Sequence, residues 1–363
     1  MTIPVENIYY LYCYAWRHFM PVQDRDVIIE QAPESIHDLW ALVLSHTFSR
    51  QVRRGLDHGY RADEGRLSLP RGRINPVRSS ATGALATAML ECSWDEFLPD
   101  TPPNRIIKAT MRRLASCGDL NKKHAHRLGI LWRGLSHVAD VVPTLQSIEC
   151  VQLNRHNSSY RLMLDVCRLI LKFLVPGDGA GEFRFKDPRR DHDHMARVFQ
   201  DFLTVWFQRN CDPSEFPPVE IGPTDLEWPA VRMGSPDDLS RLPKMKTDIT
   251  MRGPGRTLII EAKYYHDVLT SRHEEATKKI ISGHLYQLHA YLTAWRHWHP
   301  DGPLPEGILL YPTVCDPVDI NVRIHGFPVR VVTLDLAKKW PAIEVNLNNI
   351  TAKPCSSLPI LGS

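Results

Sequence analysis

The stretch KTDITMRGPGRTLIIEAKYY, residues 246–265, decides the fold expected for the C-terminal half of this chain. Two runs rich in apolar and β-branched residues flank a turn at residues 253–256, which contains two glycines and a proline. This arrangement predicts a β-hairpin. Because side chains alternate between the two faces of a strand, Glu261 and Lys263 are expected on the same face as Ile259.

Charged residues gather at one end of this hairpin. Asp248 lies before the turn, and strand pairing brings it beside Glu261 and Lys263. Carboxylates and an ammonium group near apolar neighbours are costly unless they are paired or hold a metal. Two carboxylates supply the hard oxygen ligands that Mg²⁺ prefers. We therefore predict a Mg²⁺ site with Asp248, Glu261 and the carbonyl of Ala262 as ligands. Lys263 is expected to orient or deprotonate the water that attacks a phosphodiester.

The short D-x-n-E-x-K pattern also has a simpler interpretation. On an exposed hairpin, Glu261 and Lys263 would form a surface ion pair worth less than about 1 kcal/mol. The context favours a catalytic site, because an apolar strand runs directly into E-x-K and a helix follows. That helix, predicted over residues 282–298, carries Gln287 and Tyr291 one turn apart, so both can face the hairpin. Gln287 is a candidate to position a water or contact a phosphate, and the same helix face also fits an apolar core stripe.

The length of 363 residues predicts two domains, because single hydrophobic cores rarely grow beyond about 250–300 residues. VPGDGAG, residues 175–181, follows an amphipathic helix and is rich in proline and glycine, which is typical of a boundary. We expect an α+β domain over residues 1–180. An α/β domain with the fold of PD-(D/E)XK restriction endonucleases is expected over residues 181–363.

Each predicted domain has its own order of elements. The first contains an aromatic buried opening, short strands and then helices, expected at residues 3–20, 67–97, 105–117, 122–139 and 160–175. The second has the order helix, hairpin, helix and strand, expected at residues 195–209, 246–265, 282–298 and 306–314. This alternation is α/β in character.

Composition excludes several classes of protein. A net charge of +3 neither requires nor rules out nucleic acid, although basic clusters occur at residues 66–78, 186–190 and 244–246. The eight cysteines form no C-x-x-C pair, which predicts buried thiols in a reducing, cytoplasmic setting. No secretory leader is visible, and charges interrupt the best apolar run, so we expect no membrane span. The chain has no G-x-x-x-x-G-K-[ST] loop, so it is not expected to hydrolyse a nucleotide by itself.

Several separate blocks together resemble McrC, the nuclease subunit of McrBC-type modification-dependent restriction systems. They follow the order known for that family and span most of the chain. The blocks are IPVENIYYLYCYAW (3–16), RGRI (71–74), CSWDEF (92–97), NRIIK (104–108), TDI (247–249), EAKYY (261–265) and YQLHAYL (286–292).

The resemblance implies that Asp248, Glu261 and Lys263 are catalytic and act with Mg²⁺. Gln287 would be a supporting catalytic residue. It also implies a partner, a hexameric AAA+ GTPase of the McrB type that recognises modified cytosine in DNA and is stimulated by the first domain. The competing hypothesis is an adaptor that activates this GTPase and binds DNA without cutting.

The first helix of the second domain carries two further candidates. Nucleases of this type often place an acidic residue there, near the metal. This chain has Gln200, at a position where the family usually has a glutamate, followed by Asp201. The preceding DHDH segment, residues 191–194, is expected to be a polar loop in which Asp193 caps the helix.

Overall fold

The computed structural model describes most of the chain. The described residues are 3–18, 28, 30–31, 33–177, 182–235, 237–264, 269–270, 279–314 and 317–352.

The chain forms two compact units. Unit 1 combines Met1–Arg25 with Pro188–Ser363, and unit 2 consists of Asp26–Asp187. The division expected from the sequence, 1–180 and 181–363, differs from these units because the opening segment packs with the C-terminal part of the chain. Residues 178–181 of the predicted boundary lie outside the described residues.

Unit 2 is built around helices that bury an apolar stripe. They are α3 (Ile36–Arg54), α5 (Pro102–Ala115), α6 (Lys122–Arg133), α7 (Leu145–Glu149) and α8 (Arg161–Phe173). The start of α3 is capped by Ser35, whose Oγ accepts the amide of Asp38 at 3.1 Å. The helix predicted over residues 122–139 ends earlier, at Arg133, because Gly134 follows it as a cap. Among the described residues, no helix is long and apolar enough to cross a bilayer.

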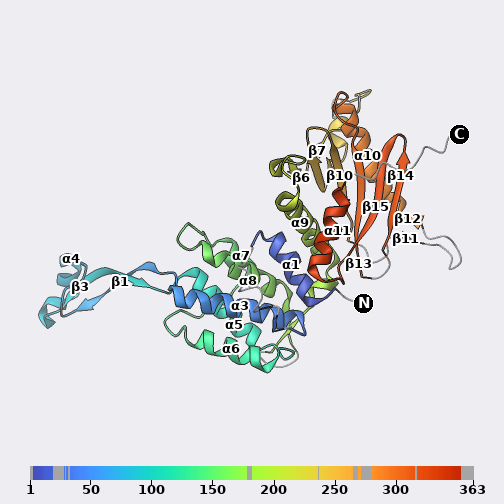
Figure 1. Cartoon of the computed structure of the whole chain (residues 1–363). Coiled ribbons are helices and arrows are strands. Elements are labelled where there is room, and N and C mark those ends of the chain that lie inside the picture. Colours follow the sequence, from blue (N-terminus) through green and yellow to red (C-terminus); the bar gives the residue numbers. More distant parts are fainter. Residues whose placement is uncertain are drawn as a thin grey trace, which may run out of the picture. The chain divides into compact units, whose positions relative to one another are not determined.

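A three-stranded antiparallel sheet with the order β1-β3-β2, here called the arm, extends away from these helices (Figure 1). Its elements are β1 (Gly59–Leu67), β2 (Arg73–Ile74), α4 (Pro76–Ala81) and β3 (Leu90–Leu98). Gly72 has a φ of +67°, and a side chain there would collide with the carbonyl oxygen of Ser93. The Arg71 guanidinium lies 5.4 Å from the centre of the Trp94 ring. The RGRI and CSWDEF blocks therefore pack against each other in the arm.

Asn104 of the NRIIK block holds β1 and β3 of the arm where they meet the helices. It is fully buried, and its side-chain amide donates to the carbonyls of Asp57 at 2.9 Å and Pro99 at 2.7 Å. Its own carbonyl oxygen accepts the hydroxyl of Tyr160 at 2.8 Å. Since Asn104 itself is fully buried, removal of its amide would take a hydrogen-bond partner from three surrounding polar groups.

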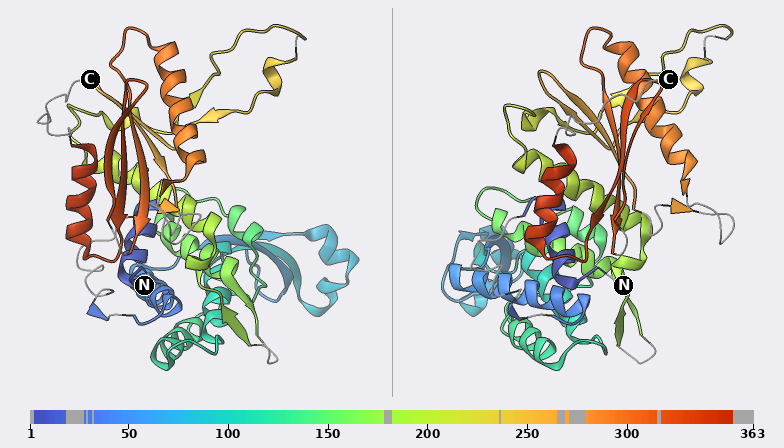
Figure 2. Two further views of the ribbon diagram at one scale, coloured as in Figure 1. Left: turned by 90° about the vertical axis from the view of Figure 1, so that its right-hand side faces the viewer. Right: turned by 45° about the vertical axis from the view of Figure 1, so that its right-hand side comes forward.

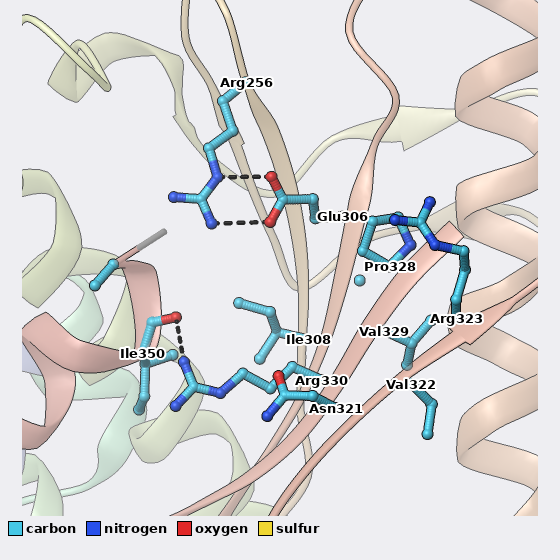
Figure 3. Close-up of a pocket in the computed structure, with 12 residues that line it drawn as sticks. Arg256, Glu306, Ile308, Asn321, Val322, Arg323, Pro328, Val329, Arg330 and Ile350 are labelled. Carbon is cyan, nitrogen blue, oxygen red and sulfur yellow. Dashed lines mark hydrogen bonds and ion pairs between the residues drawn. The ribbon is translucent and has the colours of Figure 1, made fainter. Parts of the chain in front are cut away.

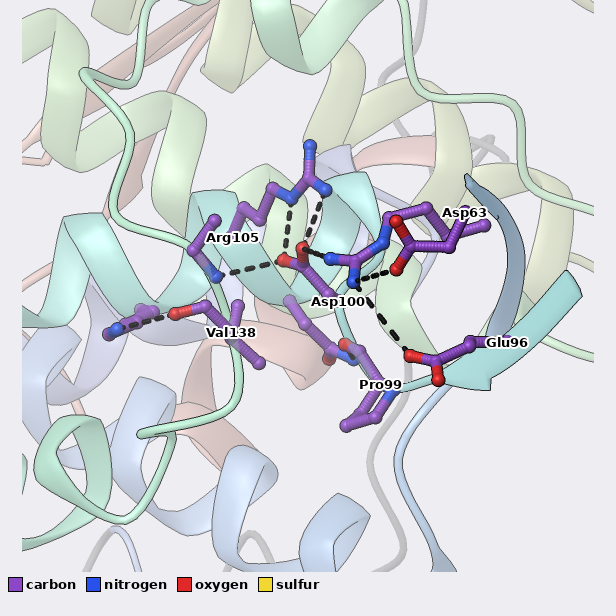
Figure 4. Close-up of polar contacts among 10 residues, drawn as sticks. Asp63, Glu96, Pro99, Asp100, Arg105 and Val138 are labelled. Carbon is purple, nitrogen blue, oxygen red and sulfur yellow. Dashed lines mark hydrogen bonds and ion pairs between the residues drawn. The ribbon is translucent and has the colours of Figure 1, made fainter. Parts of the chain in front are cut away.

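The other two polar residues of NRIIK extend this network (Figure 4). Arg105 donates twice to the carboxylate of Asp100, each at 2.7 Å, and the same carboxylate accepts the amide of Ala139 at 2.8 Å. Lys108 donates to the carbonyl of Val138 at 2.6 Å. The block is thus a structural joint between the arm and the helices of unit 2.

Unit 1 contains a mixed six-stranded sheet. Its strands are β6 (Ile221–Gly222), β9 (Ile249–Arg252), β10 (Thr257–Ala262), β13 (Glu306–Thr313), β14 (Asp319–Ile324) and β15 (Phe327–Asp335). The order is β14-β15-β13-β10-β9-β6, and β13 runs parallel to both β10 and β15 while the remaining pairs are antiparallel. The predicted hairpin is confirmed as β9 and β10, and the Gly253 amide closes its turn on the Arg256 carbonyl. Two shorter pairs are β7 (Asp225–Leu226) with β8 (Met245–Lys246) and β11 (Leu269–Thr270) with β12 (Lys279–Ile280).

Helices cover both faces of this sheet. Figure 2 shows α10 (Ser282–Trp298) on one face and α11 (Trp340–Thr351) on the other, and α9 (His192–Asn210) also packs on the sheet. The α10 range agrees with the prediction, and α9 begins slightly earlier than predicted. The core beneath α10 is a cluster of buried apolar and aromatic side chains that includes Ile259, Leu288, Leu292, Trp295, Leu309, Tyr311 and Val331.

The opening block forms α1 (Val5–Ala15), a buried helix that packs against α9. The Tyr10 ring stacks on Trp340 with centroids 4.2 Å apart. The Tyr12 hydroxyl bonds the His194 ring at 2.7 Å, and the side-chain amide of Asn7 donates to two backbone carbonyls just before α11. The aromatic residues of this block are therefore core residues of unit 1, which explains why the opening segment belongs there.

At the end of the sheet where β10 and β13 begin, two arginines hold the end of α11 (Figure 3). Arg256 forms a bidentate ion pair with Glu306 and donates to the carbonyl of Thr351 at 2.6 Å. Arg330 donates to the carbonyl of Ile350 at 3.2 Å. A pocket of about 260 Å³ lies beside them. Because these arginines already hold carboxylates and carbonyls, they act as a C-terminal cap for α11.

Candidate active site

The opposite end of β10 brings the predicted acidic residues together. Asp248 directly precedes β9, and its Oδ2 accepts the amide of Ala262 at 2.9 Å. Glu261 is the fifth residue of β10, on the same strand face as Ile259, whose side chain belongs to the core under α10. The hairpin therefore places both carboxylates at the C-terminal end of β10, as predicted. The backbone amide of Ala262 holds the Asp248 carboxylate. The role of the Ala262 carbonyl as a Mg²⁺ ligand stays a prediction.

The carboxyl group of Glu261 is buried in an unusual way. Its side chain is 2% exposed, Oε1 pairs with Lys263 Nζ at 2.7 Å, and Oε2 has no hydrogen-bond donor. Burial and the negative charge of Asp248 raise the pKa of Glu261 to about 7, although Lys263 opposes this effect. Burial also raises the pKa of Asp248. The two carboxyl groups are therefore close enough for the charge of Asp248 to affect the pKa of Glu261.

Two neighbouring buried carboxyl groups with raised pKa values are typical of a site that binds a cation. A buried oxygen without a donor and two neighbouring carboxylates would both be stabilised by a positive ion. A metal cluster of three or more His, Cys, Asp or Glu side chains is absent from the described part of the chain. The donor set here is two carboxylates, which suits a cation that keeps several waters, such as Mg²⁺.

Lys263 lies at the centre of a chain of side-chain hydrogen bonds. Its Nζ donates to Gln287 Oε1 at 2.8 Å in addition to its ion pair with Glu261. Gln287 Nε2 in turn donates to the Tyr291 hydroxyl at 2.8 Å. The side chain of Lys263 is only 17% exposed, so the alternative of an exposed surface ion pair is wrong. Gln287, expected near a water or phosphate, is found as a partner that orients Lys263.

The candidates on α9 are less closely connected to this cluster. Gln200 is half-buried and Asp201 is exposed, and across the described residues no hydrogen bond or ion pair joins either side chain to the carboxylates. Asp191, not Asp193, caps α9, since its Oδ1 accepts the amide of His194 at 3.0 Å. The DHDH segment is therefore the first turn of the helix and not a loop. The cap lies two residues earlier than expected, at Asp191, which directly follows a short 3-10 turn over Pro188–Arg190.

Three of the four arginines in the basic cluster at residues 66–78 pair with carboxylates of the arm itself. Ion pairs join Arg66 to Glu91, Arg71 to Glu96 and Arg78 to Glu64, at 3.2, 2.8 and 2.6 Å. The sequence suggested phosphate contact as a test for this cluster, but these arginines face carboxylates. The solvated-surface interpretation is therefore favoured for the arm.

Sequence reasoning missed two residues of this region. His284 lies in the first turn of α10, three residues before Gln287 and on the same helix face. Its Nδ1 lies 2.9 Å from the Tyr311 hydroxyl on β13. The i, i+3 spacing to Gln287 was the signal that could have found His284, whereas nothing local pointed to Tyr311.

Comparison with known proteins gives consistent results. The model of a family described as McrBC 5-methylcytosine restriction system component matches residues 15–312. The chain is 30% identical over 350 residues to the type IV methyl-directed restriction enzyme EcoKMcrBC of Escherichia coli (strain K12), covering 96% of this chain and 97% of that protein. A chain in the refined half-complex from a tetradecameric assembly of Thermococcus gammatolerans McrB AAA+ hexamers with bound McrC shares the fold. That match has a TM-score of 0.61 and 16% identity and covers 96% of this chain and 76% of the other.

Proposed function

The chain belongs to the family of McrBC 5-methylcytosine restriction system components, and on this premise we propose that it is the DNA-cleaving subunit of such a system, of the McrC type. The observation that carries this proposal is the cluster of Asp248, Glu261 and Lys263 at the C-terminal end of β10. These residues are buried or half-buried. Lys263 pairs with Glu261 and donates to Gln287, and the backbone amide of Ala262 holds Asp248. The mixed sheet with helices on both faces agrees with a PD-(D/E)XK nuclease fold.

The carboxylates of Asp248 and Glu261 are the groups that would hold Mg²⁺, with the carbonyl of Ala262 as a third ligand. The donorless Oε2 of Glu261 supports this assignment, since a buried carboxylate oxygen without a partner is costly. When bound, Mg²⁺ supplies a Lewis acid that polarises the scissile phosphate and lowers the pKa of water. The amide of Ala262 keeps Asp248 in place throughout.

Lys263 supplies the positive charge of the protein at this site. Glu261 and Gln287 hold its ammonium group from two sides, so it needs little rearrangement before reaction. Such a preorganised cation offsets negative charge that develops on phosphate oxygens and orients an attacking water. Gln287 and Tyr291 restrict the ammonium to one position, so they act as positioning residues.

The proposed function includes a partner. The solved assembly that shares this fold contains McrB AAA+ hexamers with bound McrC, and the chain has no phosphate-binding loop of its own. We therefore assign energy supply and recognition of modified cytosine to an AAA+ GTPase of the McrB type. Unit 2 is the part proposed to engage this GTPase and stimulate its hydrolysis.

The test is cleavage of methylated DNA by the purified chain together with its GTPase partner, GTP and Mg²⁺. We expect Lys263→Ala to lower the cleavage rate by at least about a hundredfold, because it removes a preorganised charge from the reacting centre. GTPase stimulation should not change. Lys246→Ala is the matched control, since Lys246 is an exposed lysine of the same region.

Two outcomes would count against this function. Cleavage by Lys263→Ala at the wild-type rate would contradict the assignment of the catalytic site. Normal GTPase stimulation by the wild-type chain, combined with no metal-dependent cleavage, would select the adaptor that activates the GTPase without cutting. Gln200 is the feature that supports this alternative, because it stands where the family usually has a glutamate and, within the described part of the chain, its side chain forms no hydrogen bond with the carboxylates of the site.

A further inference from the structure

His284 and Tyr311 form a second polar pair on the α10 side of the sheet. The distance between His284 Nδ1 and the Tyr311 hydroxyl is 2.9 Å, and the two rings lie with centroids 5.8 Å apart. Tyr311 is fully buried in the core under α10, whereas His284 is half-buried. The hydroxyl of the buried Tyr311 therefore holds the ring of the more accessible His284.

Strand register places this pair beside Lys263. In the parallel pairing of β10 with β13, Glu261 lies opposite Leu309 and Ala262 lies opposite Leu310. The amide of Lys263 donates to the carbonyl of Leu310 at 2.9 Å, which continues the ladder. Because side chains alternate, Lys263 and Tyr311 project from the same face, at the same end of the sheet. His284 lies over them from the first turn of α10.

The charge state of His284 also reflects its neighbour. Burial, and then the positive charge of Lys263, lower the pKa of the imidazole. His284 is therefore a neutral ring near neutral pH. A neutral imidazole held at Nδ1 by a hydroxyl has one preferred orientation, in which it can exchange hydrogen bonds without adding charge.

The cluster at the end of β10 thus has several polar side chains near Lys263. Glu261 and Gln287 contact its ammonium group directly. His284 comes from the same helix face as Gln287, one turn closer to the start of α10, and it is partly accessible. A DNA backbone that reached Lys263 would therefore pass close to this ring. Phosphate oxygens are the groups that the backbone presents there.

We propose that His284 is a further active-site residue that contacts a phosphate of the bound DNA strand, and that Tyr311 is the positioning residue that fixes its ring. This inference rests on the proposed nuclease function and adds a contact to it. The fixed ring restrains the phosphate beside Lys263, so His284 acts on the reaction through alignment of the substrate and not through a change of its own charge.

The experiment measures methylated-DNA cleavage by the complete system, with the GTPase partner, GTP and Mg²⁺. We expect His284→Ala to lower the cleavage rate by about tenfold to a hundredfold, as for the loss of a hydrogen bond to a charged group. GTPase stimulation should stay at the wild-type level. His289→Ala is the matched control, because His289 lies on the same helix but bonds His325 at 2.9 Å.

Tyr311→Phe tests the positioning role. It removes one hydroxyl, and we expect a smaller loss of rate that vanishes in the His284→Ala background, since the hydroxyl acts through the imidazole. An additive effect of the two substitutions would overturn the positioning role. If His284→Ala does not fold, His284→Asn, which keeps a donor, provides the same comparison, with an intermediate rate expected.

The failure of this inference differs from the failure of the nuclease function. Wild-type cleavage by folded His284→Ala or His284→Asn, while Lys263→Ala is inactive, would overturn the inference and leave the nuclease function standing. Wild-type cleavage by Lys263→Ala would instead overturn the nuclease function and the inference with it. A loss of rate in His289→Ala equal to that in His284→Ala would also overturn the inference, because it would indicate a general effect on α10.

Discussion

The substitution Glu261→Gln tests whether the buried carboxylate of Glu261 is a ligand of a cation. In the metal-free protein, burial and the charge of Asp248 raise the pKa of Glu261 from 4.5 to about 7. Glutamine has nearly the same shape, carries no charge and brings a donor where Glu261 Oε2 has none. We therefore expect the variant to fold, to lose metal-dependent cleavage, and to be more stable than the wild type at alkaline pH without metal.

The size of this effect follows from the pKa. A folded-state pKa above the unfolded value means that the folded protein holds the proton more tightly. The stability from this group is therefore fully present below about pH 4.5 and is lost as the pH rises through about 7. The interval between pH 4.5 and about 7, at about 1.4 kcal/mol per pH unit, corresponds to about 3 to 4 kcal/mol of unfolding free energy. Because the side chain is 2% exposed, solvent screening reduces this value little.

The assay is urea unfolding at pH 5 and pH 8, with EDTA and with Mg²⁺. In EDTA, the wild type should lose about 2 to 3 kcal/mol more than Glu261→Gln between the two pH values. Mg²⁺ should restore stability to the wild type at pH 8 and have little effect on the variant, since a ligand stabilises only the state that binds it. Glu220→Gln, at an exposed glutamate, is the control. Identical pH profiles of wild type and Glu261→Gln in EDTA would refute the reasoning.

Three further predictions concern unit 2. Asn104→Ala should lower the unfolding free energy by about 2 to 3 kcal/mol in urea titrations, because the carbonyls of Asp57 and Pro99 lose a donor and the Tyr160 hydroxyl loses its acceptor. The exposed Gln152→Ala should have almost no effect, and an equal loss in both variants would contradict this role of Asn104. Gly72→Ala should increase hydrogen exchange of the β3 amides, since residue 72 has positive φ and lies against Ser93; Gly118→Ala, which has open space around it, is the control. Equal exchange in the two alanine variants would show that the close approach at Gly72 is unimportant. The pKa of Asp100 is lowered by hydrogen bonds from Arg105 and from the Ala139 amide. The contribution of this carboxylate to the stability of the folded protein is therefore present above about pH 4 and is lost as the pH falls. Asp100→Asn should remove that part of the acid sensitivity in unfolding measurements between pH 3 and pH 6, and an unchanged acid profile would argue against the Asp100 network.

The local features of the site were predictable because their cause is local. Strand alternation alone places Glu261 and Lys263 on one face, and the glycine-rich turn places Asp248 on the neighbouring strand. Helical spacing brings Gln287 and Tyr291 to one face of α10. Each of these relations depends on residues within about one hairpin or one helix, so that sequence spacing translates directly into position.

Other features depend on which distant segments pair. The parallel ladder between β10 and β13 brings Tyr311 beside Lys263, and a parallel pair requires a long crossover whose partner strand the local pattern does not specify. The membership of α1 in unit 1 depends on stacking with Trp340, more than 300 residues away in the chain. The N-terminal cap of α9 was also predicted wrongly. Asp193 was expected as the cap, whereas Asp191, two residues earlier, is the cap in the structure.

The sequence by itself determined the hairpin, the helix that follows it and the candidate site residues Asp248, Glu261, Lys263 and Gln287. Only the tertiary structure decided that Glu261 is buried with an oxygen that lacks a donor, that Gln287 holds Lys263, and that His284 and Tyr311 lie next to them. The physical reason is that periodicity sets the face on which a side chain lies. Burial, pKa and hydrogen-bond partners are set by segments that meet only when the chain has folded.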